Sequence, residues 1–339
     1  MAFGTSGEAA TQAAAATLTE CASQPASETG AASAGVSLRT HRQRESFTRM
    51  ALGAQAPVVR ALSMRCSEAQ AQSLPNQDYA LVKLLPMGER GAAHAEGSTL
   101  CFCVCDGVGS SFKGDFAAAY LATQLVNWLA ALQPRRAPRR ASADTRTAWR
   151  EETPDAALQT SLTHALNAWA TEGQRQIMRL PLTAESAIVR EALDDLRRDY
   201  GSETVFFAGR VDRFASNDRG MAEREAEAEP TWRSQALLCW MGNVSAQVYS
   251  QSGEALPLPA MDDDRRRWST GRGVRGEVEA HIYSLDALSR ILIHTDGANP
   301  FSAQLAQFDD ETLQREALRL LTLPSNDDIT ILDIQLSGI

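Results

Sequence analysis

The sequence has few cysteines, and their spacing is not that of a metal site or a disulfide framework. Six occur in 339 residues, and none belongs to a C-x-x-C pair: Cys21, Cys66, Cys101, Cys103, Cys105 and Cys239. The residues at 101, 103 and 105 alternate along one predicted strand, so their side chains point to one face. This spacing favours reduced, buried thiols, which are typical of cytosolic proteins.

Long apolar runs and an excess of positive charge are also missing. No apolar stretch approaches the ~18 residues of a membrane-spanning helix. The first residues lack the basic and apolar regions of a secretory signal. The formal net charge of −9 gives no support for a surface that binds nucleic acid or an anionic membrane. We therefore expect a cytoplasmic protein that binds neither nucleic acid nor membrane.

The composition changes along the chain and suggests where the folded domain lies. Residues 1–45 are rich in Ala, Ser, Thr and Gly, so we expect a disordered, low-complexity tail. Residues 46–339 are predicted to form a single domain. Within it we expect a basic linker near 133–147 and a polar insertion near 214–231. The linker has no interleaved aromatic residues, which favours a solvated loop over a nucleic-acid patch.

Apolar periodicity predicts strands first, then helices, then more strands, a helix and a last strand. Strands are expected at residues 77–85, 98–106, 202–211, 233–253 (two strands joined at Gly242 and Asn243), 279–285, 290–297 and 327–336. Helices are expected at residues 113–132, 154–178, 183–200 and 302–323. This order is that of an α+β fold, with a central antiparallel β-sandwich of two sheets flanked by helices.

Acidic residues stand where several of these strands begin or end. Asp106 ends the apolar run "CFCVC", Asp296 ends "ILIHT", Asp327 precedes "ITILDI", and Asp78 opens an early strand. Glycine follows Asp106 and Asp296, which lets the backbone approach a ligand closely. Each D-G turn taken alone is more often a turn residue than a functional one.

Buried carboxylates at these positions need positive partners, because an unpaired charge next to a sheet is costly. Basic residues close to them in sequence are few, and Lys113 is the nearest. Divalent cations could supply the missing charge. Oxygen ligands without a His or Cys cluster favour Mg²⁺ or Mn²⁺ over zinc.

The order of these motifs resembles that of a known family. The relevant stretches are "PNQD", "CDGVGSSFKGDFAAAYLA", "GSETVFFAG", "WMGNVSAQVY", "LIHTDG" and "NDDITILDI". They are similar, in order and separation, to the motifs of the metal-dependent protein phosphatases of type 2C. The resemblance spans about residues 63–334 and implies a type 2C-like β-sandwich with metal ions in a cleft at one end.

The resemblance also implies site residues and a reaction. Asp106 would bridge two Mn²⁺ or Mg²⁺ ions, with the carbonyl of Gly107 completing one coordination shell. Asp296 and Asp327 would hold the other ion, and Asp78 would orient metal-bound water. A water shared by the two cations would then attack phosphoserine or phosphothreonine on a protein. The implied partners are a phosphoprotein substrate and an opposing serine/threonine kinase.

Four positions depart from the family pattern. Gln77 stands where a glutamate usually makes a water-mediated metal contact, and Ser73 where many members carry an arginine that binds the substrate phosphate. Asn243 replaces an aspartate that helps to bind a third metal in bacterial relatives. An amide oxygen is a weaker, neutral ligand, so we expect two ions. Asp328 replaces an asparagine and adds a charge close to the metals.

These departures leave more than one function open. The leading hypothesis is an active protein-serine/threonine phosphatase. A second is a catalytically weak or inactive module with the phosphatase fold, which binds metal or a phosphoprotein partner. A third, an unrelated hydrolase of nucleotides or small phosphoesters, is disfavoured by the continuous order of the motifs.

Overall fold

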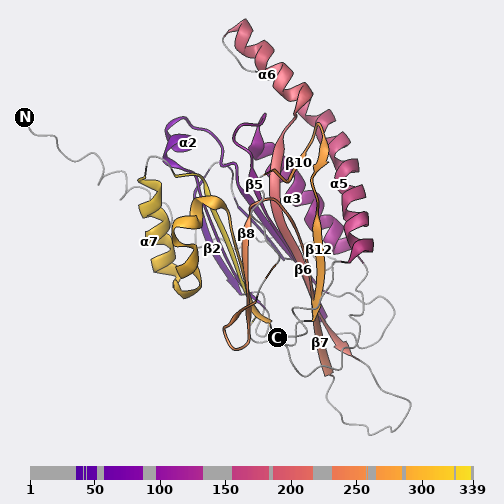
Figure 1. Ribbon diagram of the computed structural model, residues 1–339. Coiled ribbons are helices and arrows are strands. Elements are labelled where there is room, and N and C mark those ends of the chain that lie inside the picture. The colour runs from indigo at the N-terminus through magenta and orange to yellow at the C-terminus, as the bar shows by residue number, and fades with distance from the viewer. Residues whose placement is uncertain are drawn as a thin grey trace, which may run out of the picture.

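The structure is a computed structural model, and it describes residues 36–40, 42, 44–51, 57–86, 97–132, 155–182, 186–216, 231–256, 258, 265–284, 288–323 and 326–336. Two antiparallel sheets pack face to face, with helices on both outer faces (Figure 1). The predicted α+β class and two-sheet sandwich are therefore confirmed. Residues 1–35, the predicted basic linker and residues 217–230 of the predicted insertion lie outside the described residues.

Within the described residues, the first sheet has eight strands. Six of them lie side by side in the order β1 (Val36–Arg39), β4 (Tyr79–Pro86), β5 (Gly97–Gly107), β6 (Glu203–Ser216), β10 (Arg267–Ser269) and β11 (Gly273–Arg275). β10 pairs only with the start of β6, because β7 (Thr231–Met241) occupies the rest of that edge. β12 (Glu279–Ser284) then pairs with β7.

The second sheet has six strands. Their order is β2 (Ser46–Ala51), β3 (Val58–Met64), β14 (Ile329–Gln335), β13 (Leu288–His294), β8 (Ser245–Ser250) and β9 (Ala255–Leu256). The chain passes from β7 in the first sheet to β8 in the second through the predicted turn at Gly242 and Asn243. A φ of +90° at Gly242 explains the glycine there.

Three apolar layers hold the sandwich together. Phe102 and Val104 of β5 point into the layer between the sheets, while Cys101, Cys103 and Cys105 point outward. The outward face packs against α3 (Gly114–Ala131) and α5 (Ala156–Ile177). The outer face of the second sheet packs against η1 (Asp296–Gln307) and α7 (Asp310–Leu321). None of the described helices has both the length and the apolar character needed to cross a membrane.

Two further helices lie in the described part of the chain. α2 (Ser67–Ala71) follows β3, and α6 (Ala187–Asp199) extends away from the sandwich (Figure 1). Gly201 has a φ of +69° just after α6, which is the left-handed conformation of a glycine C-cap.

Two sequence predictions need correction. The single helix expected over 302–323 is interrupted, because η1 ends at Gln307 and Asp309 caps α7 by accepting a hydrogen bond from the amide of Thr312 at 2.8 Å. The predicted tail boundary at residue 45 falls too late. β1 already pairs with β4, and its Leu38 is 6% exposed. The pairing partner lies far along the chain, so the local composition gave no sign of it.

A buried ionic network on the second sheet joins three strands. Asp333 of β14 is 0% exposed. It accepts hydrogen bonds from Arg60 Nε on β3 at 2.7 Å and Arg290 Nε on β13 at 2.6 Å. Arg60 also reaches Asp310 at the start of α7 at 3.0 Å, so the network fixes this helix to the sheet.

We predict that Asp333→Asn lowers the free energy of unfolding by about 3–5 kcal/mol, because it leaves two largely buried guanidinium groups short of one negative charge. The matched control is Asp310→Asn, whose carboxylate is 32% exposed and whose loss should cost about 1 kcal/mol or less. Urea unfolding of both variants measures the difference. Equal losses would contradict a special role for Asp333.

Candidate functional site

Two of the predicted acids meet at one end of the first sheet. Cys105 of β5 lies opposite Tyr79 of β4, so the strand that ends at Asp106 runs beside the strand that starts just after Asp78. The amide of Gly107 donates to the carbonyl of Gln77 at 3.2 Å. The antiparallel register therefore places the Asp78 and Asp106 backbones side by side.

Asp296, Asp327 and Asp328 meet at the corresponding end of the second sheet. His294 of β13 pairs with Ile331 of β14, so the residues after one strand adjoin those before the other. A Cβ atom at Gly297 would lie 2.1 Å from the carbonyl oxygen of Asp328 and 2.9 Å from that of Asp327. Only glycine allows these two backbones to come so close.

Side-chain hydrogen bonds join the two sheet ends. Thr295 Oγ1 donates to Asp78 Oδ2 at 2.7 Å. The two carboxylate oxygens of Asp328 accept from the amides of Cys66 and Gln77, each at 2.7 Å. Loops from both sheets thus close over one end of the sandwich, and Asp78, Asp106, Asp296, Asp327 and Asp328 form what we call the carboxylate cluster.

Electrostatic coupling within the cluster shows how near its members are. Burial raises the pKa of Asp78 well above its usual value, and the charges of Asp106 and Asp328 raise it further. The hydrogen bond from Thr295 opposes this rise. A carboxyl group with these surroundings holds its proton more tightly than an exposed one.

The pKa values of Asp106, Asp296 and Asp328 are raised as well. Burial raises the pKa of Asp106 well above its usual value, and the charges of Asp296, Asp327 and Asp328 add to the rise. Burial, followed by the charge of Asp327, raises the pKa of Asp296. Burial also raises the pKa of Asp328, against the effect of the amides of Gln77 and Cys66. Each of these acids therefore lies within electrostatic reach of others.

The cluster has no protein cation of its own in the described part of the chain. None of its five aspartates forms an ion pair with a lysine or arginine there. Asp327 is exposed, and one of its oxygens accepts only the amide of Asp328, at 2.8 Å. A set of carboxylates without thiolate or imidazole partners fits a hard divalent cation. Among the described residues, however, no three His, Cys, Asp or Glu side chains form a ready-made metal cage.

The turn after Asp106 is built around two glycines. A Cβ atom at Gly107 would lie 2.5 Å from the carbonyl carbon and oxygen of Gly114, the first residue of α3. The turn therefore folds back tightly, and Thr204 Oγ1 donates to the carbonyl of Asp106 at 2.6 Å. These contacts fix the backbone that carries the Asp106 carboxylate.

Two further predicted residues, Gln77 and Asn243, lie at the same end of the sandwich as the carboxylate cluster but make different contacts. Gln77 contributes its backbone to two hydrogen bonds, and its side chain lies near Gly109. Asn243 lies in the turn between β7 and β8, whose neighbours pair with Phe206 and His294. This register puts Asn243 at the end of the sandwich that carries the carboxylate cluster. In the described part of the structure, Asn243 makes no hydrogen bond to the cluster.

Sequence reasoning missed several supporting residues. Thr295 directly precedes Asp296, and Asn76 Oδ1 accepts the amide of Asp78 at 2.8 Å. Ser63 joins this network by accepting from Asn76 Nδ2 at 2.9 Å. The sequence signal that could have identified them is the presence of short polar residues beside the acids Asp78 and Asp296. Asp115, in the first turn of α3, is 6% exposed and ion-paired with Arg42.

The cysteines behind the site are buried, as the sequence predicts. Cys103 and Cys105 have their sulfur atoms 3.5 Å apart and pack toward α3 with Cys239. Burial raises the pKa of Cys101 to about 12, so this thiol stays protonated near neutral pH. His294 is also buried, and burial lowers its pKa.

We predict that Asp106→Asn stabilises the protein in a metal chelator near neutral pH. A raised carboxyl pKa means that the native state binds a proton more tightly than the unfolded chain, so the Asp106 contribution to stability falls as pH rises. The gain in melting temperature over wild type should therefore be larger at about pH 7.5 than at about pH 5.5. Comparing the two proteins at each pH cancels the opposite effect of buried histidines such as His294. A pH-independent difference would contradict the prediction.

The comparisons with known proteins give structural neighbours only. No protein-family description matches this chain, and neither does any curated protein. Among solved structures, it is similar to the serine/threonine phosphatase Stp1 from Staphylococcus aureus (12% identity, 76% of this chain and 95% of that one, TM-score 0.41). It is also similar to RsbX, solved in complex with magnesium (14%, 86% and 100%, TM-score 0.41), and to a Toxoplasma gondii phosphatase (11%, 84% and 94%, TM-score 0.41). Two of these three neighbours are described as phosphatases, one of them as a serine/threonine phosphatase.

Proposed function

We propose that this chain is a metal-dependent phosphatase that hydrolyses phosphoserine and phosphothreonine on proteins. The observation that supports this most is the carboxylate cluster, in which acids from both sheets meet without a lysine or arginine partner in the described residues. A phosphate dianion would be repelled by such a cluster alone. Divalent cations bound there would reverse the sign of the potential and attract it.

The roles of the residues follow from what each side chain contacts. We assign Asp106, Asp296 and Asp327 as carboxylate ligands, because Asp106 is coupled to both others and Asp327 is exposed. The Gly107 carbonyl is a further candidate ligand. We assign to Asp78, whose carboxylate accepts a hydrogen bond from Thr295, the role of orienting water. When bound, Mn²⁺ or Mg²⁺ would supply a water of lowered pKa and positive charge for the phosphoryl oxygens.

Asp328 receives a different role from the one that the sequence suggests. Each of its oxygens accepts one backbone amide at 2.7 Å, so two other chain segments hold its carboxylate in place. We assign it as a positioning residue that ties the start of β14 to Cys66 and Gln77. A phosphoprotein substrate, an opposing serine/threonine kinase and a cytoplasmic location belong to the same proposal.

One observation favours the second candidate, a catalytically weak module of the same fold. The side chains of Gln77 and Asn243 are neutral, and they remove negative charge that would favour cations. Calorimetric titration with Mn²⁺, together with a phosphopeptide assay, separates the two candidates, since a weak module binds metal or peptide with little turnover.

We predict that Asp106→Asn lowers Mn²⁺-dependent hydrolysis of p-nitrophenyl phosphate about 100-fold or more, because a carboxylate that would hold the metal loses its charge. The control is Asp195→Asn on α6, where an exposed aspartate (63%) is changed in the same way and activity should persist. Calorimetry should show Mn²⁺ binding weakened only in the first variant. Turnover like that of the wild type in Asp106→Asn would remove the proposed mechanism.

Asn243→Asp provides an independent prediction. The turn lies at the end of the sandwich that carries the cluster, so an added carboxylate should tighten Mn²⁺ binding by about tenfold. A Mn²⁺ titration followed by calorimetry and by hydrolysis rate measures the change. An unchanged dissociation constant would show that this turn does not face the metals.

A further inference from the structure

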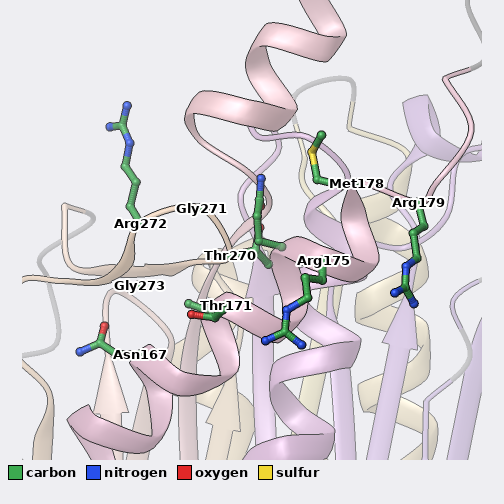
Figure 2. Close-up of a pocket in the computed structure, with 11 residues that line it drawn as sticks. Asn167, Thr171, Arg175, Met178, Arg179, Thr270, Gly271, Arg272 and Gly273 are labelled. Carbon is green, nitrogen blue, oxygen red and sulfur yellow. The ribbon is translucent and has the colours of Figure 1, made fainter.

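A second candidate site lies on the helix-covered side of the first sheet. A pocket of about 700 Å³ opens between α5 and the turn that joins β10 to β11 (Figure 2). Its base includes Thr270, which is 2% exposed and whose hydroxyl donates to Gln174 Oε1 at 2.9 Å. The pocket is thus built on a fixed floor, and it is separate from the carboxylate cluster.

Positive charge borders this pocket. Arg175 and Arg179 extend from the end of α5, and Arg272 rises from the opposite turn (Figure 2). Among the described residues, no aspartate or glutamate lines it, although the chain carries a net charge of −9. An acid-free, arginine-bordered pocket in an acidic protein is complementary to an anion.

The arginines differ in how far they are already neutralised. Arg175 pairs with Glu172, and Arg272 donates Nε to the carbonyl of Asp199 at 2.9 Å while stacking on Tyr200. Arg179 has no side-chain partner in the described part of the structure. Its guanidinium group is therefore fully available to a carboxylate or phosphate.

The shape of the pocket favours a peptide over a small molecule. Arg175, Arg179, Gly271 and Arg272 are exposed, and Met178 is 38% exposed. Small-molecule sites usually enclose most of the ligand surface, which these open walls do not. An extended chain with several negative side chains would contact the separated arginines at once.

Hydrogen bonds connect the pocket to the turn that carries Asp106. Thr270 Oγ1 accepts the amide of Ser202 at 2.9 Å, and Ser202 Oγ donates to the carbonyl of Phe112. The next amide, that of Glu203, donates to Ser111 Oγ at 3.1 Å. The pocket floor is therefore fixed to the residues that follow Asp106, at the same end of β6.

We propose that this pocket, bordered by Arg175, Arg179 and Arg272, binds an acidic peptide segment that flanks the phosphorylated residue of a protein substrate. The proposal rests on the phosphatase function for the substrate role, while binding of acidic peptide can be measured without it. The pocket would select substrates by charge at a surface beside the carboxylate cluster, which itself repels the same acidic residues.

The first experiment measures binding by fluorescence anisotropy. The full chain is titrated against a labelled oligoglutamate peptide and an oligoglutamine peptide of equal length. We expect preference for oligoglutamate, weakened about fivefold or more by Arg175→Glu with Arg179→Glu, and by added salt. The matched control is Arg315→Glu with Arg319→Glu on α7, which has the same spacing and charge change and similar exposure, 62% for Arg175 against 60% and 61%. Equal binding of both peptides, or equal loss in both double variants, would overturn the proposal.

The second experiment tests the substrate role. Phosphoserine peptides with an acidic or a neutral extension are compared in the presence of Mn²⁺. The acidic peptide should have the lower KM, and the α5 double variant should remove this difference without changing hydrolysis of p-nitrophenyl phosphate. Turnover without a preference for the acidic peptide would reject the pocket alone. Peptide binding without any turnover by the wild type would reject the phosphatase and, with it, the substrate role.

Discussion

Repulsion among five carboxylates at one end of the sandwich constrains the loops that carry them. Burial and mutual charge raise the pKa of Asp78 and Asp106 together, and no lysine or arginine of the described residues pairs with the cluster. Hydrogen bonds donated by backbone amides and hydroxyl groups oppose this repulsion. The main ones come from the two amides that bind Asp328 and from the Thr295 hydroxyl that binds Asp78. Such a site is destabilising for the fold alone, which is expected where function requires gathered charge.

The rest of the fold makes this arrangement possible. Antiparallel pairing puts the end of one strand beside the start of the next, so β5 with β4 and β13 with β14 each deliver acids to one edge. Packing the two sheets face to face then brings both edges together. Gly107 and Gly297 allow the final approach, since a Cβ atom at either position would overlap neighbouring backbone. The strands therefore set the positions of the carboxylates, and the loops only complete the approach of the two sheet ends.

The sequence predicted those features that depend on local pattern. Alternation and D-G turns located the strands and the ends where Asp106 and Asp296 lie, and helical periodicity located α3, α5 and α6. It could not predict contacts between residues far apart in the chain. The Asp333 network, the pairing of β1 with β4 and the Arg42–Asp115 ion pair are of this kind. The two hydrogen bonds that Asp328 accepts are also of this kind, because both donor amides are distant from it in the sequence.

Asp328 shows how one departure from the family pattern can have a structural reason. An asparagine amide has one acceptor oxygen, whereas a carboxylate has two. At this position both oxygens are used, one by Cys66 at the end of β3 and one by Gln77 before β4. The aspartate therefore links three chain segments where asparagine would link two. Its extra negative charge is costly beside Asp327 and Asp106, and the two amide bonds offset part of that cost. The charge at Asp328 thus accompanies its role in attaching these two chain segments to the start of β14.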